Sequence, residues 1–283
     1  MARTCGPRAS HVTKTNEAGL GQELIDLAST LARQAGAMAL LGRRAGIGDV
    51  QTKTTATDMV TEFDRASEKL IVDGLTGSRP DDAIVGEEGT FDPGTSGITW
   101  YIDPIDGTTN FLYSLPNWAV SIGATDELGT LAGVVYIPAL DELFTAIRGE
   151  GAHLNGSPIH CNPSAELSHA LLSTGFSYSA ALRTVQAQRI SQMIHLVRDI
   201  RRLGAAAIDL CYVACGRLDA YFEENLAPWD FVAGELIARE AGCRTGNFAG
   251  QPVTPSQLLV SVPNIFDELG KLIVDSSAHA GQE

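Results

Sequence analysis

The chain has 283 residues, of which 44% are hydrophobic, and this is enough to bury one large core or two joined ones. Its 34 acidic and 20 basic side chains give a net charge of −14, which argues against a nucleic-acid partner because such binding depends on Lys and Arg displacing counterions. Five scattered cysteines, an odd number, argue against a disulfide framework and favour a reducing cytoplasm.

The N-terminal part of the chain predicts a short extension followed by two helices. Residues 1–20 contain no apolar signal-peptide core, so we expect a flexible extension that does not insert into a membrane. From about Gln22, apolar residues recur at steps of three and four and predict an amphipathic helix. They are Leu24, Ala28, Leu31, Ala35 and Met38. A second helix is predicted over residues 58–75, capped by Thr57 or Asp58, with apolar positions Val60, Ala66, Leu70 and Ile71.

Apolar segments separated by short Gly or Pro turns predict a run of strands after the second helix. They cover residues 83–85, 99–102, 119–125, 131–137 and 142–147, and their short connections indicate an antiparallel meander. Near Pro163 the pattern changes, and helices alternate with strands. Strands are expected over residues 170–174, 218–222 and 258–262, and helices over residues 182–197, 208–215, 229–241 and 265–274.

This change of pattern divides the chain into two packed lobes. We expect an N-terminal α+β lobe over residues 21–163, a C-terminal α/β lobe over residues 164–275 and a tail over residues 276–283. No apolar run reaches the roughly 18 residues that a membrane span requires, so we expect no membrane partner.

Residues 103–111 (DPIDGTTNF) set two carboxylates three positions apart, directly after an apolar strand. Asp103 ends that strand, and Gly107 permits the close backbone approach that a bound anion requires. Thr108 and its successors are helix-capping types, and a helix N-terminus offers free N–H groups to phosphate. Carboxylates that suit hard cations, next to amides that suit an anion, predict metal-assisted phosphate chemistry.

Two further segments carry acids in similar settings. Glu87 and Glu88 follow an apolar run, and Asp230 stands at the start of a predicted helix. With Asp103 and Asp106, these acids would repel one another in a shared site unless divalent ions were bound. Oxygen ligands without Cys or His at metal spacing favour Mg²⁺, with Mn²⁺ as a substitute, over Zn²⁺. Taken singly, each acid fits a solvated loop, a turn or a helix N-terminal charge, and only the ordered set supports a site.

These segments resemble the inositol monophosphatase family of Mg²⁺-dependent, lithium-sensitive phosphatases. The matching segments follow the family's order over roughly residues 22–275 and are residues 53–64 (KTTATDMVTEFD), 86–88 (GEE), 103–111 (DPIDGTTNF), 204–210 (GAAAIDL) and 229–234 (WDFVAG). The resemblance implies the layered α-β-α-β-α sandwich of the inositol monophosphatase and fructose-1,6-bisphosphatase type. It also implies a homodimer with the active site between the two lobes of each chain.

The resemblance implies a role for each matching residue. The ligands of two to three Mg²⁺ ions would be Glu87, Asp103, the carbonyl oxygen of Ile105, Asp106 and Asp230. Glu87 and Thr108 would hold the water that attacks phosphorus, so that no covalent phosphoenzyme is needed. The implied substrate contacts are Asp106, Gly107, Thr108, Gly204, Ala205, Ala206, Glu223 and Asp230. Lys53, Asp64 and Glu88 would surround the metal ligands.

The resemblance specifies the substrate and its contact residues less closely than the metal ligands. Glu223 would accept hydrogen bonds from the hydroxyls of a sugar or polyol phosphate, but Glu224 is adjacent and a shift of one position would exchange the two. Residues 106–110 (DGTTN) favour inositol 1-phosphate, and histidinol-phosphate phosphatases tend to carry Lys where Thr109 stands. Fructose-1,6-bisphosphatase and histidinol-phosphate phosphatase remain alternatives. Pro228 departs from the Cys of many family members, which leaves the lithium response open.

Two other classes of protein share features with this sequence. Haloacid dehalogenase phosphatases use an Asp-x-Asp-Gly-Thr strand end, but here two residues separate Asp103 from Asp106, so the spacing does not match. Some bacterial members of the inositol monophosphatase family are thought to bind RNA-processing or transcription machinery, which keeps a binding or regulatory role open.

Overall fold

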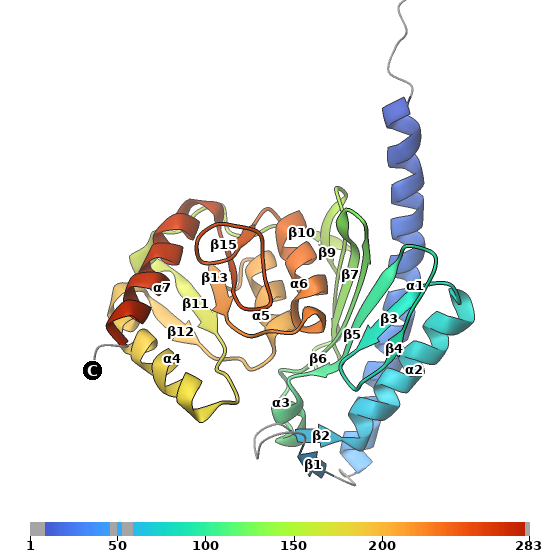
Figure 1. The fold of residues 1–283 in the computed structure, drawn as a ribbon, viewed down its shortest axis with the longest axis horizontal. Coiled ribbons are helices and arrows are strands. Elements are labelled where there is room, and N and C mark those ends of the chain that lie inside the picture. Colours follow the sequence, from blue (N-terminus) through green and yellow to red (C-terminus); the bar gives the residue numbers. More distant parts are fainter. Residues whose placement is uncertain (1–8, 46–49, 53–58, 281–283) are drawn as a thin grey trace, which may run out of the picture.

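Two sheets, each covered by helices on both faces, build the two lobes of the protein (Figure 1). The computed structural model describes the backbone of residues 9–45, 50–52 and 59–280, and the side chains of residues 19–43 and 62–277. Within the described residues, no helix is both long enough and apolar enough to cross a membrane.

The N-terminal lobe contains helices α1 (Ala9–Ala45) and α2 (Glu62–Ser78) and an eight-stranded sheet of order β10-β9-β8-β7-β6-β5-β3-β4. Its strands are β3 (Ala83–Gly86), β4 (Phe91–Asp92), β5 (Thr99–Asp106), β6 (Ala119–Asp126), β7 (Gly129–Ile137), β8 (Glu142–Ile147), β9 (Gly151–Leu154) and β10 (Ser157–Ile159). A separate pair, β1 (Val50–Thr52) and β2 (Met59–Thr61), precedes α2, and the short helix α3 (Thr108–Leu112) follows β5.

The C-terminal lobe is built on a five-stranded sheet of order β12-β11-β13-β15-β14. Its strands are β11 (Leu171–Thr174), β12 (Asp199–Arg201), β13 (Ala220–Glu223), β14 (Arg244–Gly246) and β15 (Leu258–Ser261). Its helices are α4 (Ala180–Met193), α5 (Ala206–Ala214), α6 (Pro228–Glu240) and α7 (Phe266–Ala280), with 3-10 turns η1 (Leu167–His169), η2 (Ile194–Leu196) and η3 (Pro263–Ile265).

Alternating burial along the strands creates the layers. In β13, Ala220 and Phe222 pack in the core that includes α7, whereas Tyr221 between them packs in the core of α5 and α6. The same α5 and α6 core receives Val135 and Ile137 of β7, whose neighbour Val134 packs towards α1 and α2. Helices α5 and α6 therefore lie between the two sheets. The order of layers is α-β-α-β-α, so the fold expected from the resemblance is confirmed.

Helix α1 is longer than the periodicity predicts, because it begins at Ala9 rather than near Gln22. Much of the segment expected as a flexible extension over residues 1–20 is thus helical. Weak helix formers such as Ser10 and Thr13 disfavour a helix by only about 0.5 kcal/mol each, which continuous backbone hydrogen bonding tolerates. The expected tail over residues 276–283 is likewise helical as far as Ala280, since no Gly or Pro lies between Gly270 and Gly281 in the sequence.

Three other predictions need correction. Strands β3 and β5 are parallel, not part of an antiparallel meander, because β4 reverses the chain once and the return into β5 reverses it again. Helix α2 starts at Glu62, and Ala66, expected as one of its apolar positions, is exposed. The short strands β9, β10, β12 and β14 were not predicted, since three or four residues give too little periodicity.

Candidate active site

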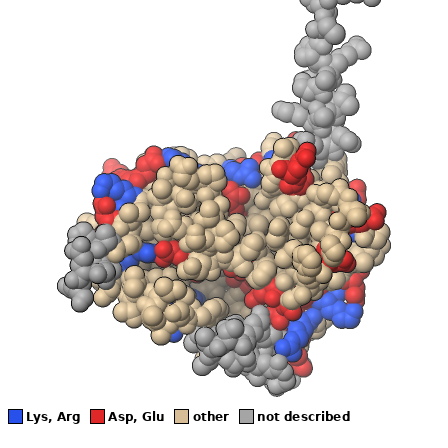
Figure 2. Space-filling model, viewed as in Figure 1, with Lys and Arg blue, Asp and Glu red and all other residues tan. Residues whose placement is uncertain are grey.

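A cavity of about 460 Å³ lies where the two lobes meet, and residues from both lobes line it. The lining includes every predicted metal ligand and substrate contact: Glu87, Asp103, Ile105, Asp106, Gly107, Thr108, Gly204, Ala205, Ala206, Glu223 and Asp230. Acidic side chains lie beside the hollow between the lobes in the space-filling view (Figure 2). Asp64 and Glu88 lie outside the lining, and Lys53 is outside the described residues.

The end of strand β5 directs two carboxylates into this cavity. In a regular strand, residues three positions apart point to opposite faces, so Asp103 and Asp106 would be separated. The pairing of β5 with β6 shifts register between these two residues, and both carboxylates line the cavity. The N–H of Ile105 donates to Asp103 Oδ1 at 3.0 Å, which fixes the turn of the chain between the two acids.

The buried acids strongly disfavour one another's charge. Asp103 is 2% exposed, and burial raises the pKa of its carboxyl well above the usual range. The neighbouring charges of Glu87, Asp106 and Asp230 raise this pKa further. Burial and the charge of Asp230 also raise the pKa of Asp106, against the lowering effect of a hydrogen bond from Ala207. The cluster therefore favours anything that brings positive charge into the cavity.

Two of these carboxylates also hold helix N-termini. Asp106 accepts hydrogen bonds from the N–H groups of Ala206, at 3.2 Å, and Ala207, at 2.7 Å, in the first turn of α5. Asp230 accepts from the N–H of Ala227 at 2.7 Å, just before α6. Free N–H groups in the first turn of a helix need such acceptors. The N–H of Ala206 is consequently engaged by the protein itself, although Ala206 lines the cavity.

Helix α3 starts beside the same carboxylates. Gly107 has φ of 90°, a left-handed backbone conformation that a residue with a Cβ rarely adopts, and it turns the chain from β5 into α3. Thr108 Oγ1 lies 3.2 Å from the carbonyl oxygen of Ile105 and 3.3 Å from Asp64 Oδ1. Asp64, which is buried on α2, thus contacts the side chain of Thr108 without lining the cavity itself.

The donor set is made of oxygen atoms, which are the ligands that Mg²⁺ prefers. Within the described residues, no group of three or more Asp, Glu, His or Cys side chains is arranged to hold a metal ion. The acids are Glu87, Asp103, Asp106 and Asp230, and Ile105 lines the same cavity. Mg²⁺ commonly binds one or two carboxylates and completes its shell with water and substrate phosphate. The residues present are therefore suited to this ion.

Glu223 and its neighbours Glu224, Asn225 and Leu226 line the same cavity. The hydroxyl of Tyr221 donates to Glu223 Oε2 at 2.6 Å. Burial raises the pKa of Glu223, while the bond from Tyr221 and the charge of Arg202 lower it. Glu224 also lines the cavity, but it pairs with Arg189 at 2.8 Å. Glu224 is therefore engaged by Arg189, whereas Glu223 is held by Tyr221 within the lining of the cavity.

Sequence reasoning missed two residues around this site. Among the described residues that line the cavity, Arg202 is the sole cation, and its guanidinium lies against the backbone of Gly204. Glu68 on α2 is 3% exposed and accepts hydrogen bonds from the turn that contains Glu87. A sequence signal existed for Glu68, because it occupies the buried face of α2 at the helical spacing that links Asp64 to Ile71.

A layered α-β-α-β-α fold with a carboxylate cluster between its lobes defines the class of this protein. The chain belongs to the inositol monophosphatase family, whose model matches residues 21–279. The resemblance drawn from the sequence motifs is therefore confirmed.

Individual relatives agree with this assignment. The chain is 45% identical over 242 residues to the inositol-1-monophosphatase SuhB of Mycobacterium tuberculosis, covering 80% of this chain and 82% of the relative. It is 41% identical over 251 residues to the Nus factor SuhB of Pasteurella multocida, covering 87% and 94% of the two chains. The solved structure of the Thermotoga maritima IMPase superposes with a TM-score of 0.83 at 34% identity, covering 91% of this chain and 99% of that one.

Proposed function

We propose that this protein is a Mg²⁺-dependent phosphatase that hydrolyses inositol 1-phosphate. The observation that carries the proposal is that Glu87, Asp103, Asp106, Asp230 and Glu223 all line one cavity, where burial and neighbouring acids raise the pKa values of Asp103 and Asp106. A cluster of carboxylates suits metal ions that neutralise a phosphate ester, and a further carboxylate suits the hydroxyls of a polyol.

Different residues are responsible for metal binding, for the attacking water and for phosphate binding. Two to three Mg²⁺ ions would be held by Glu87, Asp103, Asp106, Asp230 and the Ile105 carbonyl. They would neutralise the charge of the phosphate and lower the pKa of the attacking water. Glu87 and Thr108 hold and orient the attacking water, and Glu87 accepts its proton. The N–H groups of Gly107 and Thr108, at the start of α3, donate to the phosphate oxygens.

The polyol lies against the C-terminal lobe. Glu223 accepts hydrogen bonds from ring hydroxyls, and the hydroxyl of Tyr221 keeps its carboxylate oriented. Gly204, Ala205 and Ala206 form a wall without long side chains beside the ring. Arg202 supplies donors on the same wall. The alternation of acceptor and donor across the cavity matches a substrate rich in hydroxyl groups.

We propose that the protein acts in the cytoplasm and forms a homodimer. The four described cysteines, Cys161, Cys211, Cys215 and Cys243, are free thiols, which fits a reducing compartment. Light scattering of the purified protein would test the dimer, with a single monomer mass as the contradicting result.

Phosphate release measured with Mg²⁺, with Mn²⁺ and without metal tests the proposal. The substrates are inositol 1-phosphate, fructose 1,6-bisphosphate, histidinol phosphate and 3′-phosphoadenosine 5′-phosphate, each with and without lithium. We expect inositol 1-phosphate to be preferred and lithium to inhibit. Preference for another compound would keep the mechanism and replace the substrate.

A binding role is the second candidate, because a relative that is 41% identical bears the name Nus factor SuhB. The carboxylates of the cavity would then have no catalytic use. Absence of turnover on all four compounds, in protein that is folded and binds Mg²⁺, would favour this role over catalysis.

A further inference from the structure

Two buried carboxylates hold the two ends of the segment that contains Glu87. Asp82, 4% exposed, directly precedes β3, and Glu68, 3% exposed, projects from α2 to the turn after β3. A buried charge is stable only when hydrogen bonds or opposite charges satisfy it. The partners of each carboxylate therefore reveal what it holds in place.

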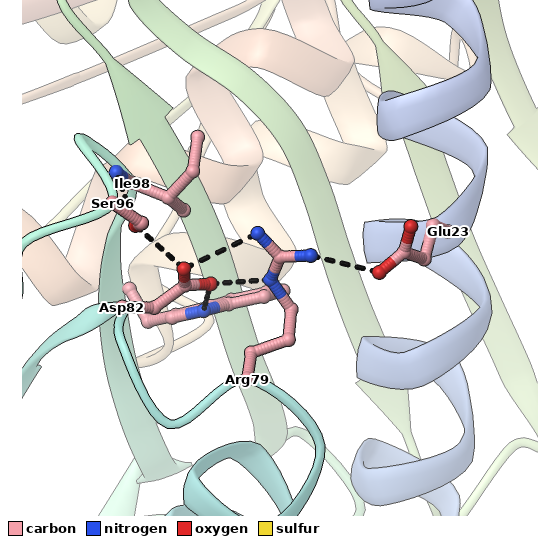
Figure 3. Close-up of polar contacts among 6 residues, drawn as sticks. Glu23, Arg79, Asp82, Ser96 and Ile98 are labelled. Carbon is pink, nitrogen blue, oxygen red and sulfur yellow. Dashed lines mark hydrogen bonds and ion pairs between the residues drawn. The ribbon is translucent and has the colours of Figure 1, made fainter.

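The partners of Asp82 belong to the framework of the N-terminal lobe. Asp82 accepts hydrogen bonds from Ser96 Oγ at 2.6 Å and Trp100 Nε1 at 2.9 Å, and it pairs with Arg79. Arg79 also reaches Glu23 on α1 at 2.7 Å (Figure 3). None of these five described residues lines the cavity. Asp82 thus ties β3 and the loop before β5 to the helices.

The partners of Glu68 belong to the turn that carries Glu87. Glu68 Oε2 accepts from the N–H of Glu88 at 2.8 Å, and Oε1 accepts from Thr90 Oγ1 at 2.6 Å and from the N–H of Thr90 at 3.3 Å. The turn is closed by a backbone bond of 2.9 Å from the N–H of Gly86 to the carbonyl of Thr90. A single carboxylate on α2 consequently satisfies three donors of this turn.

Gly86 makes this arrangement possible. A Cβ built on Gly86 would lie 2.4 Å from Glu68 Oε2. A contact this short is not tolerated, so any side chain at position 86 would push the carboxylate away from the turn. The glycine before Glu87 serves close packing against Glu68, since its own φ is not in the left-handed region.

Both peptide groups that flank the Cα of Glu87 are fixed by these contacts. The N–H of Glu87 donates to the carbonyl of Ile102 on β5 at 3.1 Å, and the next N–H, that of Glu88, donates to Glu68. With the peptide planes on both sides held, the backbone angles at Glu87 are fixed, and so is the direction of its Cβ. Glu87 lines the cavity beside Asp103.

We propose that Glu68 is a positioning residue for Glu87, which aims the Glu87 carboxylate at the metal ions and the attacking water. This inference rests on the proposed function. The carboxylate of Glu68 does not itself line the cavity, and it acts through the turn it holds. Partners that orient metal ligands typically contribute about 10- to 100-fold to metal affinity or activity.

The test uses two matched substitutions of buried carboxylates in the full-length protein. In Glu68→Gln, the amide group presents a donor to one N–H of the turn, so we expect Mg²⁺ affinity and kcat to fall by about 10- to 100-fold. Asp82→Asn disturbs the other end of β3, so we expect a lower melting temperature with Mg²⁺ affinity unchanged. Thr90→Val removes one of the three bonds to Glu68 and should give a smaller loss of Mg²⁺ affinity.

Mg²⁺ binding is measured by titration calorimetry without substrate, and thermal unfolding checks the fold. Unchanged Mg²⁺ affinity in Glu68→Gln would overturn the inference, and so would an equal loss in Asp82→Asn, because any loosening of the segment would then suffice. If Glu68→Gln does not fold, Thr90→Val decides, with unchanged affinity counting against the inference. Wild-type protein that binds no Mg²⁺ would instead refute the proposed function.

Discussion

The carboxylate of Asp106 accepts a hydrogen bond of 2.7 Å from the backbone N–H of Ala207, which lies 101 positions further along the chain. Asp106 ends strand β5 of the N-terminal lobe, and Ala207 lies in the first turn of α5. One residue therefore joins the two lobes at the cavity and is also expected to bind metal. Metal ligation and lobe geometry are coupled through it.

Replacing Asp106 with Asn should damage both functions. Asn retains one acceptor oxygen, but its amide would place a donor against the N–H of Ala206 or Ala207. We expect kcat with Mg²⁺ to fall by at least about 100-fold, beyond the range for residues that only orient a ligand, and the melting temperature to fall too. Phosphate release and thermal unfolding measure the two effects. A variant as stable as the wild type would contradict the coupling of the lobes through Asp106.

Asp103→Asn should separate activity from stability. The pKa of Asp103 is raised by burial and by Glu87, so its charge destabilises the metal-free fold, and the N–H of Ile105 can still donate to the Asn oxygen. We expect a higher melting temperature in metal-free buffer and a loss of Mg²⁺-dependent turnover of at least about 100-fold. Retained turnover would refute the assignment of Asp103 as a metal ligand.

Arg202→Met should weaken substrate binding without affecting the chemical step. Loss of one charge-assisted donor to a substrate hydroxyl corresponds to roughly 1.4 kcal/mol, so KM for inositol 1-phosphate should rise about tenfold, with kcat nearly unchanged. Arg201→Met is the control, because Arg201 pairs with Asp199 at 2.6 Å and does not line the cavity. Equal KM values for the two variants would remove Arg202 from the substrate contacts.

Asp209→Asn should stabilise the protein, and increasingly so at higher pH. Asp209 on α5 is 1% exposed, and burial raises its pKa well above the usual range. The Ser173 hydroxyl and Arg202 oppose this rise, whereas Glu223 and Asp106 add to it.

The sign follows from proton linkage. The pKa of Asp209 is higher in the folded state than in the unfolded state. At a pH between these two pKa values the folded state binds more protons, so the free energy of unfolding falls as the pH rises through this range. Asn does not titrate, so the variant does not lose stability in this way. Thermal unfolding at pH 5 and pH 8 should show a larger gain for the variant at pH 8, and a gain that shrinks with pH would contradict the raised pKa.

The sequence by itself predicted the long helices and strands and the acids that line the cavity. The periodicity of Leu24, Ala28, Leu31 and Ala35 gave the buried face of α1, and all four are buried. The acids of residues 103–111, with Glu87 and Asp230, were recognised because a motif is a set of neighbouring residues whose spacing survives in a linear sequence. Elements of this kind depend on interactions within a few positions.

Only the tertiary structure decided which distant residues serve these motifs. Four contacts join segments that the local pattern treats separately. Glu68 holds the turn of Glu87, Asp106 caps α5, Arg202 approaches the cavity, and β3 pairs in parallel with β5. The physical reason is that a buried polar group must find a partner somewhere in the folded chain, but nothing in its own neighbourhood specifies where. Chain topology and close packing make that choice.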